Sequence, residues 1–364
     1  MQGQADPRFQ NGLTRAVGID WPIIQAPMAG VSGPALAAAV SNAGGLGSLG
    51  LGAMAADAAA ETIAATRAAT DRPFHVNLFC HRPARADPAR EAAWLARMGP
   101  LFAGFGARPP ERLAEIYRSY AEDRAMQAML LDLRPPVVSF HFGLPPADHL
   151  AALRRAGVFV MASATNLAEA RAGVAAGAQA IIAQGWEAGG HRGLFDPAAP
   201  DPRLGMLALV QMLAAALPVP VVAAGGIMTG GAVAGALAAG ASAAQLGTAF
   251  IACPESLADD SYRAALTGAG GQRTVMTAAI SGRPARCLGN RFTDWAADLA
   301  AAEIPDYPRA YDAGKALNAA ARAAGETGFG AQWAGQGAPL ARALPAAALM
   351  AALVQEMRQA GAAP

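Results

Sequence analysis

The sequence predicts an α/β protein that folds as a (β/α)8 barrel, the TIM barrel class. Short apolar runs typical of buried strands alternate with alanine-rich runs of helical length, and eight such units precede residue 250. A chain of 364 residues with 54% hydrophobic content can form one barrel of about 250 residues with additions. A doubly wound open sheet is the alternative arrangement of the same units.

The strand predictions rest on apolar runs, and the helix predictions on the alanine-rich runs between them. In chain order, the eight strands begin at 22–25, 45–49, 74–79, 137–142, 158–161, 180–183, 220–223 and 243–246. Helices are predicted between most of them, at 34–43, 57–70, 148–156, 166–176, 204–217 and 229–239.

Two segments do not fit this repeat. Residues 83–134 form a long, arginine-rich helical insertion between the third and fourth strands, and residues 293–364 form a helical C-terminal extension. We therefore expect a barrel domain over 12–292 that contains the insertion, and an extension that packs at the barrel mouth because no Pro/Ser linker separates it. Long additions to barrels often act as lids.

Composition excludes several classes of partner. The formal net charge is +1 and no long run of like charge occurs, so the chain lacks the basic footprint of a nucleic-acid binder. Cys80, Cys253 and Cys287 are scattered, which argues for a reducing compartment. The N-terminus lacks a hydrophobic signal core, and runs such as 343–354 are too short to cross a bilayer. We expect a cytoplasmic protein with small-molecule partners; the oligomeric state stays open.

Polar side chains fall on the inward face of the predicted strands, near their C-terminal ends. Because side chains alternate along a strand, the residues that share a face can be read directly. They are Ile23 with Gln25, His75 with Asn77 and Phe79, Ser139 with His141, Ile182 with Gln184, and Ala243 with Gln245 and Gly247. Amides and imidazoles suit the edge of a heteroaromatic ring better than a metal or a peptide.

The segment 184–193 predicts a cofactor site at the mouth of the sixth strand. Gly189 and Gly190 allow the backbone to approach a flat or anionic ligand closely, and His191 follows them. A surface turn with a solvated histidine is the alternative interpretation.

A phosphate site is predicted from the loops after the seventh and eighth strands. Barrels commonly hold phosphate there with backbone N–H groups, a helix N-terminus and a hydroxyl. Gly226 and Thr248 are the candidates. A glycine pair before a helix is a weak motif alone, and its place in the strand order strengthens it.

Two other motifs are rejected. Residues 45–50 carry the spaced glycines of a dinucleotide fingerprint, but they follow a helix and form a strand. His75, Cys80 and His81 resemble a metal cluster, yet His75 and Cys80 should point to opposite faces of one strand. No metal site is predicted.

The extension carries a further polar set. Tyr307, Tyr311 and Lys315, the one lysine of the chain, are spaced by four residues and would share one helical face. This stripe is either ordinary packing with a solvated lysine or a binding surface for a small anionic, partly apolar substrate.

Taken together, these segments resemble the bacterial class I nitronate monooxygenases. The matching residues span nearly the whole chain: 25–28, Asn77, 139–143, 184–193, 225–227, 245–248, 281–286 and 333–336. The core from Glu187 to His191 is shared with flavin-dependent enoyl reductases, so it identifies only the superfamily. The segment 139–143 and the two tyrosines with Lys315 favour the nitronate enzymes.

The resemblance implies an FMN-dependent enzyme that oxidises an alkyl nitronate, above all propionate 3-nitronate, with O2 to a carbonyl product and nitrite. Its FMN contacts would be Met28, Asn77, Gln184, Gly189, Gly226, Gln245, Leu246, Gly247 and Thr248. The catalytic pair would be His191 and His141, with Tyr117, Tyr307, Tyr311 and Lys315 around the substrate. Two alternatives remain: an FMN-dependent NAD(P)H reductase of enoyl or quinone substrates, and a barrel without redox chemistry.

Overall fold

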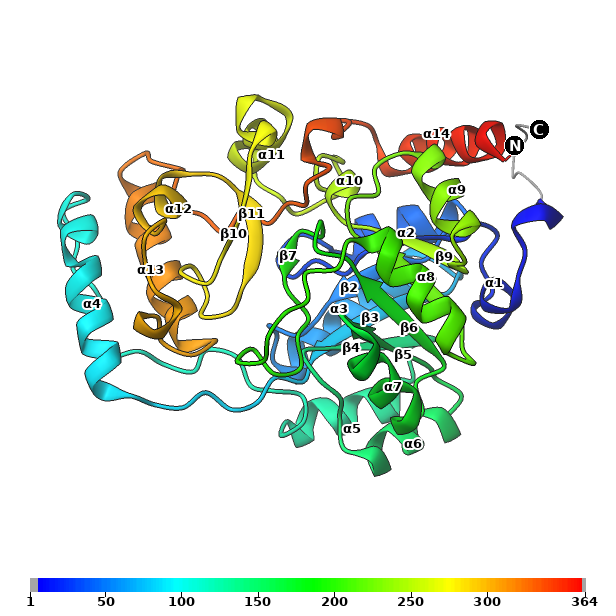
Figure 1. Ribbon diagram of the computed structural model, residues 1–364, viewed down its shortest axis with the longest axis horizontal. Coiled ribbons are helices and arrows are strands. Elements are labelled where there is room, and N and C mark those ends of the chain that lie inside the picture. The colour runs from blue at the N-terminus through cyan, green and yellow to red at the C-terminus, as the bar shows by residue number, and fades with distance from the viewer. Residues whose placement is uncertain (1–5, 362–364) are drawn as a thin grey trace.

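The computed structural model describes residues 6–361, and its centre is a closed barrel of eight parallel strands (Figure 1). The strands lie in the order β1-β9-β8-β6-β5-β4-β3-β2, and a parallel bridge between Ile24 and Leu46 joins β1 to β2 and closes the ring. Their bounds are β1 (Ile23–Gln25), β2 (Gly47–Gly50), β3 (Phe74–Phe79), β4 (Val137–His141), β5 (Phe159–Ala164), β6 (Ala180–Gln184), β8 (Val221–Ala224) and β9 (Ala243–Leu246). The predicted (β/α)8 barrel is confirmed.

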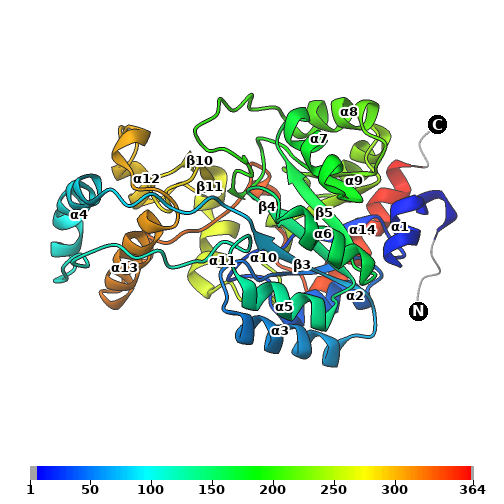
Figure 2. The ribbon, with the colours of Figure 1, turned by 90° about the horizontal axis from the view of Figure 1, so that it is seen from below.

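Helices surround the strands, and all six predicted helices are present within two residues of their predicted ends (Figure 2). The ring consists of α2 (Pro34–Asn42), α3 (Ala56–Ala69), α5 (Arg124–Leu133), α6 (Ala147–Arg155), α7 (Leu167–Ala176), α8 (Met206–Ala216), α9 (Gly230–Ala238) and the short α10 (Thr248–Ile251). Helix α5 lies within the predicted insertion, but it packs between α3 and α6. It therefore serves as the ring helix that follows β3.

Local signals fix where several helices begin. Asn166 and Thr229 accept backbone N–H groups at the starts of α7 and α9, and Asp87 does so at the start of α4 (Pro88–Ala103). Such side chains satisfy N–H groups that have no partner inside a helix. At the N-terminal end of the barrel, α1 (Gly12–Val17) inserts Leu13 and Val17 into an apolar cluster with the strand interiors. This plug leaves the opposite end of the barrel for polar residues.

Segments far apart in the chain form a second hydrophobic cluster beside the barrel mouth (Figure 1). It joins α4 to α12 (Arg291–Trp295) and α13 (Arg309–Ala323), next to a three-stranded antiparallel sheet of β10 (Thr274–Thr277), β11 (Ala285–Leu288) and β7 (Gly190–His191). The insertion and the extension thus pack against each other as well as against the barrel. Shorter elements are α11 (Asp260–Thr267), η1 (Pro7–Phe9), η2 (Ala269–Gln272), η3 (Ala301–Glu303) and η4 (Ala338–Leu340). The domain boundary at residue 292 stays a prediction.

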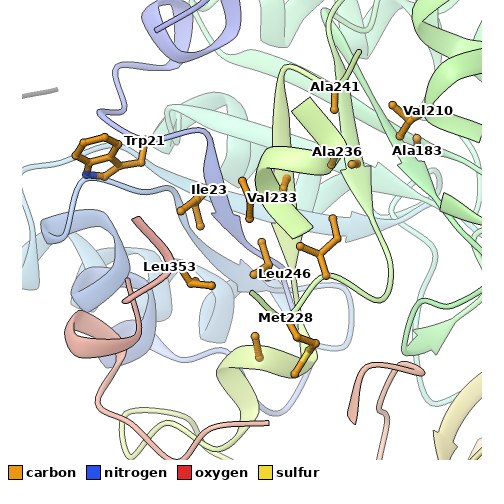
Figure 3. Packing of buried hydrophobic residues seen from close by; sticks show 14 of the residues in the cluster. Trp21, Ile23, Ala183, Val210, Met228, Val233, Ala236, Ala241, Leu246 and Leu353 are labelled. Carbon is orange, nitrogen blue, oxygen red and sulfur yellow. The ribbon is translucent and has the colours of Figure 1, made fainter. Parts of the chain in front are cut away.

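The last helix, α14 (Ala346–Ala360), returns to the outside of the barrel and packs on α9 and α2. Leu353 of this helix joins the large barrel cluster that also contains Ile23, Val233 and Leu246 (Figure 3). The approach is close, since a Cβ on Gly230 would lie 2.0 Å from the Leu353 carbonyl oxygen. Of the extension, α13 faces the mouth and α14 covers the barrel wall. Each helix within residues 6–361 is too short or too polar to span a membrane.

Candidate active site

A cavity of about 590 Å³ opens at the C-terminal ends of the barrel strands. Strand ends, the loops after β8 and β9, and α13 all contribute to its wall. The predicted site residues that line it are Met28, Asn77, Tyr117, His141, Gln184, Gly189, His191, Gly226, Gln245, Gly247, Thr248, Tyr307, Tyr311 and Lys315. Leu246 is not among the lining residues, because its side chain is 1% exposed and packs in the hydrophobic cluster outside the strands. Only its backbone is left to contact a ligand.

A buried polar network supports the floor of the cavity. The His75 ring joins Ser48 Oγ at 2.8 Å to Ser139 Oγ at 2.6 Å, and Asn77 Nδ2 donates to the same Ser139 oxygen at 2.7 Å. Burial lowers the pKa of His75 to about 3, so its ring is neutral near pH 7. Asn77 uses its N–H groups on Ser139 and keeps its carbonyl oxygen available for a ligand.

His141 is held by partners at both ring nitrogens. Its Nε2 lies 3.1 Å from the backbone oxygen of His191, and its Nδ1 lies 2.6 Å from Ser163 Oγ. Because a carbonyl oxygen only accepts, Nε2 carries the proton and Nδ1 accepts from Ser163. Burial, more than any other cause, lowers the pKa of His141 to about 4. His141 is therefore neutral, and neither nitrogen is free for a substrate in this arrangement.

Gln184 fixes the turn that carries His191. Its Nε2 donates to the His191 carbonyl oxygen at 2.9 Å, and its Oε1 accepts from the Gly193 N–H at 2.8 Å. Gly193 is required by close packing, because a Cβ there would lie 2.7 Å from Cε1 of His141. The amide side chain of Gln184 thus closes a loop of backbone around the imidazole of His191.

His191 differs from His141 in having one ring nitrogen without a protein partner in the described part of the chain. Its Nε2 lies 2.9 Å from Ser281 Oγ, and that hydroxyl also reaches the Arg283 carbonyl oxygen at 3.3 Å. When Ser281 donates to this carbonyl, it accepts from Nε2–H and leaves Nδ1 as an acceptor. Burial, more than any other cause, lowers the pKa of His191 to about 3, and the nearby positive charge of Arg283 acts in the same direction.

Aromatic side chains and one ammonium group form the opposite wall. Lys315 Nζ lies 5.0 Å from the ring centroid of Tyr117 and 5.5 Å from that of Tyr311, and Tyr307 lies 5.3 Å from the His191 ring. Burial raises the pKa of Tyr117 to about 12 and also raises those of Tyr307 and Tyr311, so the phenols stay protonated. Tyr117 comes from the insertion and brings that segment to the cavity.

Tyr307, Tyr311 and Lys315, which are spaced by four residues, do not all lie on one helix. Helix α13 begins at Arg309, so Tyr311 and Lys315 lie on it while Tyr307 precedes it. Pro308 stands immediately before the first helical residue, where proline commonly starts a helix. The expectation of a single helical face was therefore wrong for Tyr307, although its ring still reaches the cavity.

The charges that line the cavity favour an anion. Its charged lining residues are Asp259, Lys315 and Arg322, and Asp259 forms an ion pair with Arg322. Within residues 6–361, Lys315 has no carboxylate at ion-pair distance. Partial desolvation beside the aromatic rings lowers the Lys315 pKa, although the residue as a whole stays exposed at the cavity rim. An anionic group bound beside it would offset this desolvation.

The glycine loops after β8 and β9 present backbone N–H groups to the cavity. Gly225 and Gly226 have φ of 122° and 70°, a region that favours glycine. The N–H groups of Gly226 and Gly247 have no protein acceptor among the described residues. Thr248 Oγ1 accepts from the Gly335 N–H at 2.9 Å and keeps its own hydroxyl proton to donate. These donors match the needs of a phosphate group.

Two other lining residues bear on a cofactor. Gln245 Oε1 is buried in the cavity wall without a hydrogen-bond partner among the described residues, as a group awaiting a ligand donor would be. Gly189 is required by a different contact, since a Cβ there would lie 2.5 Å from the Gly335 nitrogen. Because Gly189 has no side chain, the backbone around Gly335 can pack against it, and a ligand can approach it closely as well.

Comparison with known proteins decides the family. A family model described as nitronate monooxygenase matches residues 10–356. The chain belongs to the nitronate monooxygenase family. It is 59% identical over 354 residues to a nitronate monooxygenase of Paraburkholderia phytofirmans, with 97% of each chain covered. It is 57% identical over 346 residues to one of Pseudomonas aeruginosa, covering 95% of this chain and 99% of that relative.

Solved structures agree with this membership. A nitroalkane oxidase from Streptomyces ansochromogenes matches with a TM-score of 0.86 and 42% identity, covering 96% of this chain and 99% of that one. FabK from Thermotoga maritima matches with a TM-score of 0.71 and 29% identity, covering 96% of each chain. The predicted resemblance to nitronate monooxygenases is confirmed, as is the prediction of an oxidoreductase.

Three residues of this nitronate monooxygenase site were missed by the sequence prediction. Ser163 contacts His141, Ser281 contacts His191, and the Trp333 ring lies 4.9 Å from the His191 ring. The fifth strand was predicted to begin at 158–161 and runs from Phe159 to Ala164, and alternation along its full length would have placed Ser163 inward. Ser281 and Trp333 lie in irregular segments where no periodic signal exists.

Proposed function

We propose that this chain is an FMN-dependent nitronate monooxygenase that oxidises alkyl nitronates, above all propionate 3-nitronate, with O2 to a carbonyl product and nitrite. The observation that carries the proposal is that one cavity contains both a neutral His191, whose Nδ1 has no partner within residues 6–361, and Lys315, which has no carboxylate partner within the same range. A nitronate with a carboxylate offers two anionic ends to this pair. Three scattered free cysteines support a cytoplasmic location.

The cofactor assignment follows from the unsatisfied groups of the cavity. The N–H groups of Gly226 and Gly247 and the hydroxyl of Thr248 would hold the phosphate. Asn77 and Gln245 would meet polar edges of the ring system, and the list of proposed contacts also includes Met28, Gln184, Gly189 and, through its backbone, Leu246. When bound, FMN supplies the electron acceptor and passes electrons to O2.

The chain's own side chains would bind and orient the nitronate. A nitronate is already a carbanion equivalent, so binding needs an anion site and no strong base. Lys315 would attract the carboxylate, while Tyr117, Tyr307 and Tyr311 narrow the space around the carbon chain. His191 contacts the reacting group. Rotation of the Ser281 hydroxyl lets Nδ1 either accept a proton or donate a hydrogen bond to a nitronate oxygen.

His141 was predicted as a second catalytic residue, and the hydrogen bonds favour a positioning role within the catalytic pair. Both of its nitrogens are engaged by Ser163 and by the His191 backbone. We propose that His141 and Gln184 together hold the His191 carbonyl, so that the imidazole of His191 keeps one orientation toward the substrate.

Purification followed by an absorbance spectrum and a nitrite assay tests this function. We expect a yellow protein that releases nitrite from propionate 3-nitronate under air while consuming O2. A colourless protein would support a barrel without redox chemistry. A yellow protein that forms no nitrite from any alkyl nitronate would also contradict the proposal.

An FMN-dependent NAD(P)H reductase of enoyl or quinone substrates is the second candidate. The segment from Glu187 to His191, which resembles that of flavin-dependent enoyl reductases, favours it. Anaerobic mixing with NADH or NADPH separates the two functions. The monooxygenase should keep its visible flavin absorbance, whereas a reductase should lose it rapidly.

A further inference from the structure

Arg283 holds a buried positive charge that no carboxylate of the described chain neutralises directly. The residue is 3% exposed, its Nη2 donates to the Leu194 carbonyl oxygen, and its Nε has no hydrogen-bond partner within residues 6–361. The two carboxylates nearest to Arg283, those of Glu169 and Asp196, already have other partners. Glu169 accepts from Thr165 and from the Phe195 N–H, and Asp196 pairs with Arg82 at 3.1 Å. Burying a charge without a paired carboxylate is costly in free energy, because the interior solvates the ion less well than water does.

The guanidinium of Arg283 stacks on a residue that borders the active site. Its central carbon lies 4.2 Å from the ring centroid of Phe142. The Phe142 ring in turn lies 4.5 Å from the His141 ring, 5.6 Å from the His191 ring and 5.5 Å from the Tyr307 ring. One aromatic ring therefore separates the buried cation from three side chains of the cavity wall.

Phe142 is held in an unfavourable backbone conformation. Its φ is 72°, a region that bulky side chains rarely adopt, and such strain persists only where the surroundings impose it. The contact with the Arg283 guanidinium is one of the interactions that stabilise the ring in this place. Loss of that contact would loosen the wall that Phe142 supports.

The position of Arg283 also affects what the cavity binds. Water screens charges at the surface, but a buried charge acts on its neighbours through a medium of low dielectric constant. An anion in the cavity gains from this charge, and a neutral ligand of the same shape does not. Lys315 reaches the cavity from the α13 side, whereas Arg283 lies behind the histidines.

We propose that Arg283 is a positioning residue of the active site: through Phe142 it supports the wall of His141, His191 and Tyr307, and its charge makes the cavity prefer anions to neutral ligands. The inference rests on the proposed function, since the anions in question are alkyl nitronates and the nitrite that they release.

Calorimetric titration of the flavin-loaded protein, without O2, tests the proposal with nitrite as the anion and 2-methyl-2-nitropropane, which has no α hydrogen and cannot ionise, as the neutral ligand. Arg283→Met removes the charge and keeps much of the volume, and it should weaken nitrite binding about tenfold or more while changing binding of the neutral ligand by less than about threefold. Arg283→Lys keeps the charge and should bind nitrite within about threefold of the wild type. Equal losses for both ligands in Arg283→Met, or no loss for nitrite, would overturn the proposal.

Arg82→Met is the matched control. It removes one positive charge from the same region, but the Arg82 side chain is 73% exposed and its charge is screened by water. Nitrite binding should stay within about twofold of the wild type. A loss as large as that of Arg283→Met would show that net charge, and not the buried position, is responsible, and would overturn the proposal.

Three further outcomes are decisive. If Arg283→Met does not fold, Arg283→Lys alone decides, because a tenfold loss of nitrite affinity with the charge retained contradicts the inference. If the wild-type protein carries no flavin and produces no nitrite, the proposed function fails. If the wild type is active and Arg283→Met binds nitrite normally, only this inference fails.

Discussion

His141 and His191 are both partly buried and neutral near pH 7, yet their hydrogen bonds divide their roles. Protein groups engage both nitrogens of His141, while Nδ1 of His191 has no protein partner among the described residues. A neutral nitroalkane must lose its α proton before oxidation, whereas a nitronate has already lost it. Only the first substrate therefore depends on a base, and His191 is the residue placed to supply one.

His191→Asn should separate the two substrates. Because general bases contribute about 10²- to 10⁴-fold, turnover of neutral nitroethane should fall by at least about 10²-fold, and turnover of its nitronate by less than about tenfold. Steady-state nitrite assays on both substrates measure this difference. Equal losses would refute the division of labour.

A second prediction concerns how kcat/KM for a neutral nitroalkane changes as the pH falls below neutrality. Burial lowers the pKa of His191 to about 3, and the basic form of an imidazole exists only above its pKa. Its basic form should therefore persist as the pH falls, and kcat/KM for a neutral nitroalkane should stay level from about pH 8 to about pH 5. A decrease centred near the ordinary histidine pKa of about 6.5 would show that His191 titrates as a solvated ring.

Gly193→Ala should disturb the site without touching the substrate. The new Cβ would lie 2.7 Å from Cε1 of His141, so that ring or the backbone of Gly193 must move. We expect kcat to fall about tenfold or more for nitronates as well as nitroalkanes. Gly99→Ala in α4, where a Cβ meets nothing within 4 Å, should leave kcat unchanged. Wild-type activity in Gly193→Ala would exclude the close packing described here.

At the scale of elements, prediction worked where the signal was local. Each barrel strand was predicted from an apolar run and six of the eight ring helices from alanine-rich runs, so their existence could be read from neighbouring residues. The sheet of β7, β10 and β11 was not predicted, because β7 has two residues and pairs with a strand about 95 positions later. Residue periodicity contains no information about such a distant pairing.

An ion pair links two added elements that sequence could not connect. Arg309 of α13 contacts both carboxylate oxygens of Glu91 in α4, at 2.6 and 2.8 Å. The Arg309 guanidinium, through this hydrogen bond, lowers the pKa of Glu91. A carboxyl whose folded pKa is depressed stabilises the protein above its unfolded pKa, and this stabilisation disappears as the pH falls through the folded value.

Glu91→Gln should therefore lower the melting temperature by roughly 2 °C or more at pH 7, and the difference from the wild type should shrink toward about pH 4. Thermal unfolding followed by circular dichroism at both pH values measures it. Glu303→Gln is the control, because its ion pair with Arg97 is exposed on both sides and should contribute little. A difference for Glu91→Gln that is constant with pH would contradict the assigned role of the ion pair.

On the scale of the whole molecule, the cavity is built by both the barrel and the added segments. Asn77, Gln184 and Gln245 reach it from barrel strands, while Tyr117 and Lys315 reach it from the insertion and the extension. The inward polar residues were predictable because alternation and strand order place them at one end of a barrel. The hydrogen-bond partner of His191 could not be predicted, because Ser281 lies in a loop whose path carries no periodic signal.

The central claim is that this one cavity binds FMN with its phosphate at the glycine loops and its ring system beside His191. A crystal structure of the flavin-loaded protein tests it most directly. The account predicts phosphate oxygens within hydrogen-bonding distance of the Gly226 and Gly247 N–H groups, with the ring system bordered by Asn77, Gln184 and His191. A flavin bound elsewhere, or one whose ring system lies away from His191, would contradict it.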